Sequence, residues 1–194
     1  MKGIAAVILA AGQSRRMGRP KLLLPWGNTT VLGQVIAVFA EAGIEEIVVV
    51  TGGAREQVEA LAGASARTVF NPEYAEGEML SSIQVGLGAL GPSTRAALIG
   101  LGDQPQVQKE TVRAVCEAYA RSQSPLVVPS HNLRRGHPWL ADRSVWPELL
   151  SLPAGRSPRE FLNAHARLIH YVNLDTPTVL EDLDTPEDYL KSRP

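Results

Sequence analysis

Short apolar segments alternate with segments of helical character over the first two thirds of the chain. Residues 4–10, with the sequence IAAVILA, form a continuously apolar run that ends shortly before Gly12. Short uninterrupted apolar runs are typical of strands that are buried on both faces of a parallel sheet. The pattern predicts strands at residues 4–10, 46–51, 67–70, 96–101 and 126–129.

Helices are predicted between these strands. Thr29 or Thr30 can cap a helix that runs to about Ala42, and Gly43 is suited to end it. Three further helices are predicted at residues 54–61, 79–90 and 108–121. This alternation favours a three-layer α/β/α, Rossmann-like fold, in which helices cover both faces of a mostly parallel sheet.

The pattern loosens after about residue 130, where prolines become frequent. Residues 131–139 predict a hairpin or an antiparallel edge of the sheet. Helices are expected at residues 144–150 and 158–165, a late strand at 168–172 and a closing helix at 185–190. With no repeat and no convincing linker, residues 1–194 are interpreted as one domain.

Composition excludes several classes of protein. Hydrophobic residues make up 44% and charged residues 20%, so a disordered, collagen-like or coiled-coil chain is not expected. The formal net charge of −1 gives no reason for the molecule to bind nucleic acid or an anionic membrane. The one cysteine, Cys116, cannot form an internal disulfide, and we expect it to pack inside a helix.

The apolar N-terminal run also has some likeness to a secretory signal. The basic residues that follow it directly, among them Arg15 and Arg16, oppose translocation, and the run is far shorter than the roughly 20 residues of a membrane span. A buried strand explains it better, and a cytoplasmic location is expected.

The loop after the first predicted strand combines small and basic residues. Ala10, Ala11 and Gly12 allow a ligand to approach the backbone, whose free N–H groups can hold phosphate oxygens. Arg16 and Lys21 can bind phosphate as a planar fork and as a mobile point charge. The alternative is a solvated basic loop.

Two familiar nucleotide motifs fail. The phosphate loop GxxxxGK[ST] is not matched, because Met17 stands where its second glycine belongs. Residues 86–91, GLGALG, match GxGxxG, but they end a predicted helix instead of following a strand. We expect these glycines to allow close packing or close approach of a ligand.

A second loop, residues 100–105 (GLGDQP), follows the fourth predicted strand. Asp103 stands there on a sharp turn at the strand's carboxyl end, where ligands bind in such sheets. Mg²⁺ usually takes one or two carboxylates and completes its shell with phosphate oxygens and water. Asp103 is therefore a candidate magnesium ligand, and the alternative is an aspartate that caps the next helix.

These loops resemble a known family. The first is similar to the LAAGxSxRMGxxK signature of nucleotidyltransferases with a GT-A-like fold, and the chain most resembles the molybdenum cofactor cytidylyltransferases of the MobA-like group. Other segments agree in the family's order: Asn71-Pro72 with residues 77–87, the GDQP of residues 102–105, the GHP of residues 136–138 and the DLDTPED of residues 182–188.

The resemblance implies a reaction and a set of site residues. The terminal phosphate of a molybdopterin-type cofactor attacks the α-phosphorus of CTP, pyrophosphate leaves, and a molybdoenzyme is a further potential partner. The AAG and GDQP patterns favour CTP over GTP. The implied residues are Arg16, Lys21 and Asp103 for catalysis, Asp103 and Asp184 for Mg²⁺, Leu9, Ala10, Ala11, Gly12, Ser14, Arg16, Lys21, Thr51, Gly52, Asn71 and Ser82 for the nucleotide, and Ser81, Gly136 and His137 for the second substrate.

Alternatives remain open at this point. His137 can be a structural residue in a turn, and Thr185-Pro186-Glu187-Asp188 can be a helix start that leaves Asp182 and Asp184 unassigned. The enzyme can act with another nucleotide or on a different acceptor, such as a sugar or alcohol phosphate. A non-catalytic cofactor-binding or insertion module is the third hypothesis.

Overall fold

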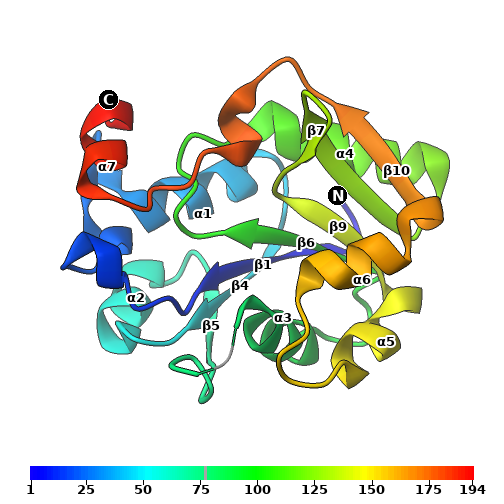
Figure 1. Ribbon diagram of the computed structural model, residues 1–194, viewed down its shortest axis with the longest axis horizontal. Helices are drawn as coiled ribbons and strands as arrows, with labels where there is room; N and C mark the ends of the chain where they lie inside the picture. Colours follow the sequence, from blue (N-terminus) through cyan, green and yellow to red (C-terminus); the bar gives the residue numbers. More distant parts are fainter. Residues whose placement is uncertain (77) are drawn as a thin grey trace.

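A mixed β-sheet forms the middle of the molecule, and helices cover both of its faces (Figure 1). The computed structural model describes residues 1–76 and 78–194. Along the sheet the strands follow the order β10-β7-β9-β6-β1-β4-β5, and β8 pairs with β7. Their bounds are β1 Ile4–Ala10, β4 Glu46–Thr51, β5 Arg67–Phe70, β6 Ala96–Leu101, β7 Leu126–His131, β8 Arg134–Arg135, β9 Trp139–Asp142 and β10 Ile169–Asn173.

Strand β1 lies at the centre of the parallel half of the sheet. It pairs with β4 on one side and with β6 on the other, and Leu9 stands opposite both Val50 and Leu101. The loops that follow β1 and β6 therefore leave the same edge of the sheet side by side. This adjacency decides where the chemically active loops meet.

The antiparallel part of the sheet differs from its predicted position. The hairpin expected within residues 131–139 is present as β7 and β8, but the longer antiparallel strand β9 lies between β6 and β7 and not at an edge. Its apolar residues Trp139 and Leu140 are almost fully buried, which requires neighbours on both sides. The edge on this side of the sheet is β10, whose Tyr171 is 40% exposed.

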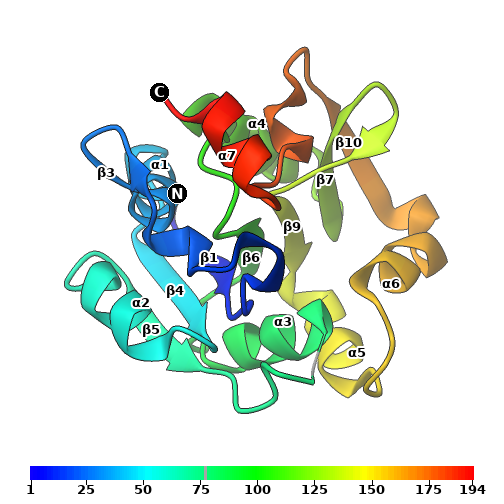
Figure 2. The same cartoon turned by 60° about the vertical axis from the view of Figure 1, so that its left-hand side comes forward.

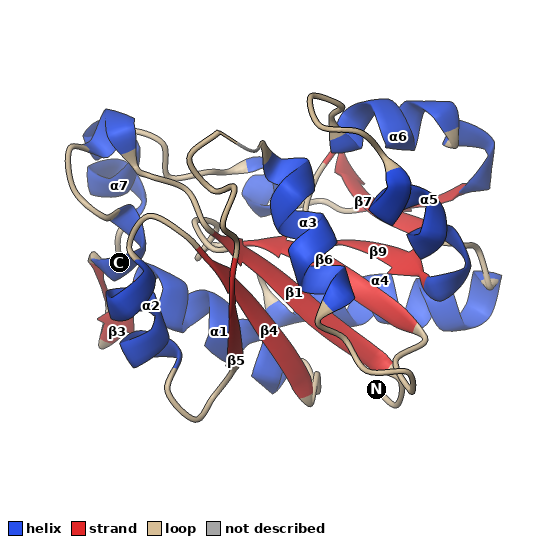
Figure 3. Cartoon of the chain, turned by 90° about the horizontal axis from the view of Figure 1, so that it is seen from below, coloured by secondary structure: helices blue, strands red, loops and turns tan. Residues whose placement is uncertain are grey.

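The helices form two layers, one on each face of the sheet (Figure 3). Alternate residues of β1 separate into two clusters of buried side chains, with Ala6 and Ile8 in one and Ala5 and Val7 in the other. The predicted α/β/α arrangement, with one helical layer on each face of the sheet, is therefore present. The first cluster is covered by α1 Val31–Glu41, α2 Arg55–Ala62 and α4 Lys109–Ser122, and the second by α3 Met79–Gly88, α5 Trp146–Ser151 and α6 Pro158–Ala164.

Helix starts follow the capping residues in the sequence. The hydroxyl of Thr30 accepts from the N–H of Gly33 at 3.1 Å, which confirms the predicted start of α1. The last helix, α7 Pro186–Ser192, begins with a capping box between Thr185 and Asp188. Figure 2 shows α7 at the same end of the sheet as the loop after β1, and the Tyr189 hydroxyl donates to the carbonyl of Pro25 at 2.7 Å.

Smaller features complete the fold. A small hairpin pairs β2 Pro25–Trp26 with β3 Thr29–Thr30. It was not predicted, because strands of two residues leave no periodic pattern in the sequence. Cys116 is buried in α4 as expected, and this burial raises the pKa of its thiol to about 12. No helix in residues 1–76 and 78–194 has both the length and the apolar character needed to cross a bilayer.

The glycines of the GLGALG stretch serve close packing. Gly86 lies inside α3 where the helix crosses β1, and a Cβ atom there would stand 2.2 Å from Cγ1 of Val7. Val7 is fully buried and cannot move away. The stretch ends a helix, so its likeness to a dinucleotide motif carries no function.

This packing yields a prediction with a matched control in the same helix. Gly86→Ala should lower the free energy of unfolding by about 1–3 kcal/mol, because overpacking forces a buried strand and helix apart. Gly88→Ala places its Cβ in open space and should be neutral or stabilising by up to about 1 kcal/mol. Urea denaturation measures both, and equal effects of the two substitutions would contradict this account.

Candidate active site

A cavity of about 560 Å³ opens where the carboxyl ends of β1 and β6 meet. Ligands bind beyond the carboxyl ends of strands in open α/β sheets, so this is the expected position for a substrate site. Most of the residues implied by the family resemblance line it. They are Leu9, Ala10, Ala11, Gly12, Ser14, Arg16, Lys21, Ser82, Asp103 and Asp184.

The loop after β1 is held in shape by contacts within itself. Ser14 has a left-handed backbone with φ 51°, and its hydroxyl accepts from the N–H of Lys21 at 3.1 Å. Two short 3-10 helices, Arg15–Met17 and Lys21–Leu23, bury Met17 and Leu22 in the core. Because the basic residues alternate with these buried anchors, the loop directs Arg16 and Lys21 to the cavity.

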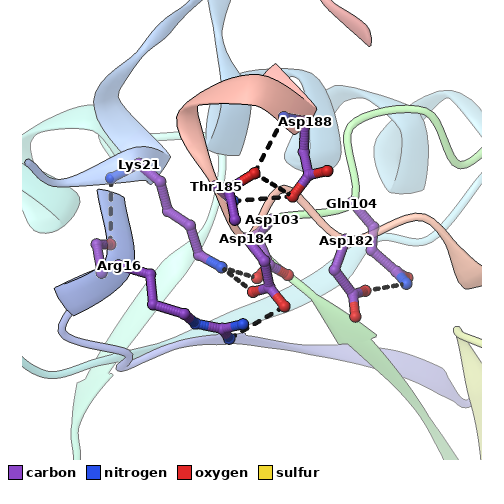
Figure 4. Close-up of polar contacts among 9 residues, drawn as sticks. Arg16, Lys21, Asp103, Gln104, Asp182, Asp184, Thr185 and Asp188 are labelled. Atoms are coloured by element: carbon purple, nitrogen blue, oxygen red, sulfur yellow. Dashed lines mark hydrogen bonds and ion pairs between the residues drawn. The ribbon is translucent and has the colours of Figure 1, made fainter. Parts of the chain in front are cut away.

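Two cations and two carboxylates pair across this cavity (Figure 4). The Lys21 ammonium contacts Oδ2 of Asp103 and lies 3.2 Å from Oδ1 of Asp184. Arg16 Nη2 lies 3.0 Å from Oδ2 of Asp184. The Lys21 side chain is only 14% exposed, whereas that of Arg16 is 69% exposed. The Lys21–Asp103 pair is therefore protected from water, whereas Arg16 is exposed and can exchange Asp184 for another partner.

The protonation of Lys21 is secured by its neighbours. Burial lowers the pKa of its ammonium, but the charges and hydrogen bonds of Asp103 and Asp184 outweigh that effect and raise the pKa above its usual value. Lys21 is consequently a permanent cation at the floor of the cavity. That is the state required to neutralise a phosphate.

Two further residues belong to this cluster, although no role was predicted for either. The Gln104 amide donates to Oδ1 of Asp182 at 2.6 Å, and Asp182 also lines the cavity. Enclosure by the cavity walls and the nearby charge of Asp103 raise the pKa of Asp182. Both residues stand in the GDQP and DLDTPED motifs, but 78 positions separate them and only the fold reveals their contact.

Four residues implied as contacts line neither this cavity nor the second one described below. Thr51 is fully buried and its hydroxyl donates to the Val69 carbonyl at 3.4 Å, while a Cβ atom on Gly52 would stand 2.4 Å from the Ala11 carbonyl oxygen. The third and fourth are Asn71 and Ser81.

Asn71 and Ser81 form a buried network behind the cavity wall. The Asn71 amide donates to the hydroxyls of Ser81 at 2.9 Å and Ser82 at 3.0 Å, and the Ser81 hydroxyl donates to the Glu78 carbonyl. The network orients Ser82, which does line the cavity. Gly77, the first residue of the matched G-x-x-x-S stretch, lies outside the described residues.

A second cavity of about 930 Å³ adjoins the first, and Glu78 and Met79 at the start of α3 line both. Gly136 and His137, implied as second-substrate residues, line this second cavity. Burial lowers the pKa of His137 to about 4, so its imidazole is neutral at physiological pH. Aromatic and basic side chains share the lining, namely Trp139, Tyr171, Arg134, Arg135 and Arg159.

The arginine at the centre of this second lining is held in place. Arg135 Nε donates to the Tyr171 hydroxyl at 2.9 Å, and Nη1 donates to the Asn163 side chain at 2.7 Å. These contacts fix the guanidinium beside an aromatic ring. The cavity is thus suited to a flat ring system that carries negative charge.

The site's carboxylates do not make a complete metal cage. Within the described ranges, no group of three or more His, Cys, Asp or Glu side chains is arranged to hold a metal ion. Asp103 and Asp184 instead flank the Lys21 ammonium, so a cation already stands between two carboxylates. Two carboxylates supplemented by phosphate oxygens are the donor set that suits Mg²⁺.

Comparison with known proteins agrees with this geometry. The family model described as a MobA-like NTP transferase domain matches residues 6–168. A molybdenum cofactor cytidylyltransferase of Escherichia coli (strain K12) is 29% identical, over 100% of this chain and 97% of the relative. A nicotine blue oxidoreductase of Paenarthrobacter nicotinovorans is 32% identical, over 95% of this chain and 93% of that protein.

Solved structures show the same architecture. The crystal structure of Rv0371c from Mycobacterium tuberculosis H37Rv superposes with a TM-score of 0.85 at 30% identity and covers 98% of this chain and 97% of its own. A structure of Rv0371C in complex with manganese gives a TM-score of 0.81 at 29% identity, with coverage of 98% and 97%. With a family model that spans most of its length, the chain belongs to the MobA-like NTP transferase family and is a nucleotidyltransferase.

Proposed function

We propose that the protein transfers a cytidylyl group from CTP to the terminal phosphate of a molybdopterin-type cofactor and releases pyrophosphate, with Mg²⁺ as its metal. One observation carries this proposal: Arg16 and Lys21 meet Asp103 and Asp184 at the floor of the first cavity. Both elements that a metal–triphosphate complex needs are thereby present in one place.

The arrangement supports an exchange of partners when the substrate binds. Asp103 and Asp184 would hold the divalent cation, and Arg16 and Lys21 would turn to the phosphate oxygens. The metal, when bound, supplies charge neutralisation between phosphate oxygens. The manganese complex of a structural relative is consistent with a divalent cation in this fold.

The reaction requires alignment more than covalent chemistry by the protein. A phosphate oxygen of the acceptor forms a bond to the α-phosphorus of CTP while the bond between that phosphorus and the α–β bridging oxygen breaks. The electron pair leaves with pyrophosphate. The attacking phosphate is already largely ionised near pH 7, so no general base is needed. Arg16 and Lys21 stabilise the charge that develops in the transition state.

The two cavities fit the two substrates. The nucleotide would bind in the first cavity, held by residues 9–12, Ser14 and Ser82. Thr51, Gly52 and Asn71 would support these residues from behind. The acceptor would occupy the second, with Gly136 and His137 on its wall and Ser81 supporting the shared rim. A reacting phosphate would then lie near Glu78 and Met79, where the cavities meet.

Membership of the family does not by itself fix the nucleotide or the acceptor, and one relative is named as an oxidoreductase. Paired carboxylates facing Arg16 and Lys21 have a purpose in nucleotidyl transfer, whereas binding or insertion of a cofactor does not need them. The preference for CTP rests on the AAG and GDQP patterns and on the likeness to the Escherichia coli cytidylyltransferase.

Pyrophosphate release tests the proposed reaction directly. Each of CTP, GTP, ATP and UTP is supplied with Mg²⁺, with and without molybdenum-loaded molybdopterin. Release is expected only when CTP and the cofactor are both present. A faster reaction with GTP would refute the cytidine preference, and release with CTP and a sugar phosphate in place of the cofactor would refute the acceptor.

Removal of the proposed metal carboxylate should abolish turnover without unfolding the protein. Asp103→Asn is expected to lower kcat by at least about 100-fold, about 2.7 kcal/mol of transition-state stabilisation. Asp175→Asn is the matched control, since Asp175 is exposed and does not line either cavity. Wild-type rates in Asp103→Asn would remove the metal assignment.

If Lys21 leaves Asp103 and Asp184 when the substrate binds, one substitution of Lys21 should have opposite effects on the affinities for Mn²⁺ and for CTP. Lys21→Met frees Asp103 and Asp184, so Mn²⁺ alone should bind about tenfold more tightly, while CTP without metal should bind about tenfold more weakly. Arg19→Met removes the same charge from the same loop and should change neither affinity by more than about twofold. Isothermal titration calorimetry measures both. Weaker binding of both ligands to Lys21→Met would contradict the exchange.

A further inference from the structure

The chain brings Asp182 and Asp184 to the first cavity on a segment without regular secondary structure. Residues 181–184 lie between a 3-10 helix, Pro177–Leu180, and the start of α7. Both aspartates line the cavity, and the intervening Leu183 is fully buried in the core. Since no strand pairing fixes these residues, the positions of their carboxylates depend on contacts with neighbouring elements.

The loop after β6 supplies three of those contacts, and Figure 4 shows the one between Gln104 and Asp182. The N–H of Leu183 donates to the Asp103 carbonyl at 3.1 Å. The side-chain amide of Gln104 donates to Oδ1 of Asp182 at 2.6 Å and lies 3.5 Å from the Val179 carbonyl. Gln104 is only 2% exposed. One buried side chain therefore bonds to Val179, just before the segment, and to Asp182 within it, and ties both to the loop that carries Asp103.

The bonding of Gln104 is one-sided. Its donor end is used, but its buried oxygen Oε1 has no hydrogen-bond partner among the described residues. An unpaired buried acceptor is costly, so a residue kept in this state calls for an explanation. The donor end gives one. An uncharged amide can hold a carboxylate without competing with a metal cation for it, whereas an arginine or a lysine would compete.

We propose that Gln104 is a positioning residue for the metal site: through Asp182 and Val179 it fixes the segment that carries Asp184, and thereby sets the place of Asp184 relative to Asp103. This rests on the proposed role of Asp103 and Asp184 as metal ligands. Groups that orient metal ligands through hydrogen bonds typically contribute 10- to 100-fold to metal affinity.

The same contacts reach the second cavity. The Val179 carbonyl also accepts from the N–H of His137 at 3.0 Å, and a Cβ atom on Gly136 would stand 2.5 Å from that carbonyl oxygen. One short segment, residues 179–184, thus contacts the wall of the second cavity and carries Asp182 and Asp184 of the first. Gln104 joins this segment to the loop after β6.

Direct binding of Mn²⁺ tests this inference without turnover. Free Mn²⁺ is measured by electron paramagnetic resonance during titration of the protein with CTP present and no acceptor. Gln104→Leu should bind Mn²⁺ about 10- to 100-fold more weakly than the wild type. Its affinity for CTP without metal should change by less than about twofold, because Arg16 and Lys21 are untouched.

The chain offers a matched control in the same loop. Gln106 also has a buried unpaired Oε1, and it makes no hydrogen bond to residues 179–184 among the contacts of the described chain. Gln106→Leu should leave Mn²⁺ affinity within about twofold of the wild type. Equal Mn²⁺ affinity in Gln104→Leu and Gln106→Leu would overturn the inference and leave the proposed reaction intact.

A second variant keeps the test decisive if Gln104→Leu does not fold. Gln104→Glu retains the length of the side chain but turns an acceptor toward Asp182, so it should also weaken Mn²⁺ binding by at least about tenfold. Wild-type Mn²⁺ affinity in folded Gln104→Glu would refute the positioning role. Absence of Mn²⁺ binding by the wild type, even with CTP, would instead refute the metal role on which the inference rests.

Discussion

The contact of Lys21 with two carboxylates is the interaction on which the site depends. Its partners Asp103 and Asp184 come from the end of β6 and from the C-terminal segment, and 163 positions separate Lys21 from Asp184. Arg16 pairs with Asp184 as well, so two cations balance two carboxylates at this cavity. The same pairing keeps Lys21 protonated and holds two carboxylates near a single point. A metal–triphosphate complex can replace these contacts with equivalent ones, so the site is organised before substrate binds.

The order of the strands explains why this cluster can form and why a second cavity lies beside it. Pairing of β1 with β6 places the cationic loop next to Asp103. Insertion of β9 between β6 and β7 then carries the Gly136–Pro138 turn toward the same end of the sheet. The start of α3 contributes Glu78 and Met79 to both cavities, and Gly86 allows that helix to lie against β1. Each of these features brings the two cavities closer together.

Some of the residues implied by the family resemblance line the first cavity, and others support its wall from behind. Asn71 is fully buried and orients Ser82, while Gly52 permits the backbone of Ala11 to pass closely. Both residues support the cavity wall without lining it. Gln104 belongs to the same class, and its contact with Asp182 shows how a motif residue without a charge can govern charged neighbours.

Elements with local signals can be predicted from the order of residues alone. Strands β1, β4, β5 and β6 have their predicted bounds. In β1, β4 and β6 burial on both faces leaves a mostly apolar run, and Thr30 and Thr185 mark helix starts through hydrogen bonds within one turn. The loops that carry Arg16, Lys21 and Asp103 were recognisable for the same reason.

Which side chains meet depends instead on how distant elements pack together. The internal position of β9, the contact of Gln104 with Asp182 and the burial of Thr51 depend on strand order and on the packing of elements distant in sequence. Hydrophobic periodicity reports whether a residue faces the core, but it contains no information about its neighbour across the sheet. The pairing of charges that makes this site is therefore a property of the fold.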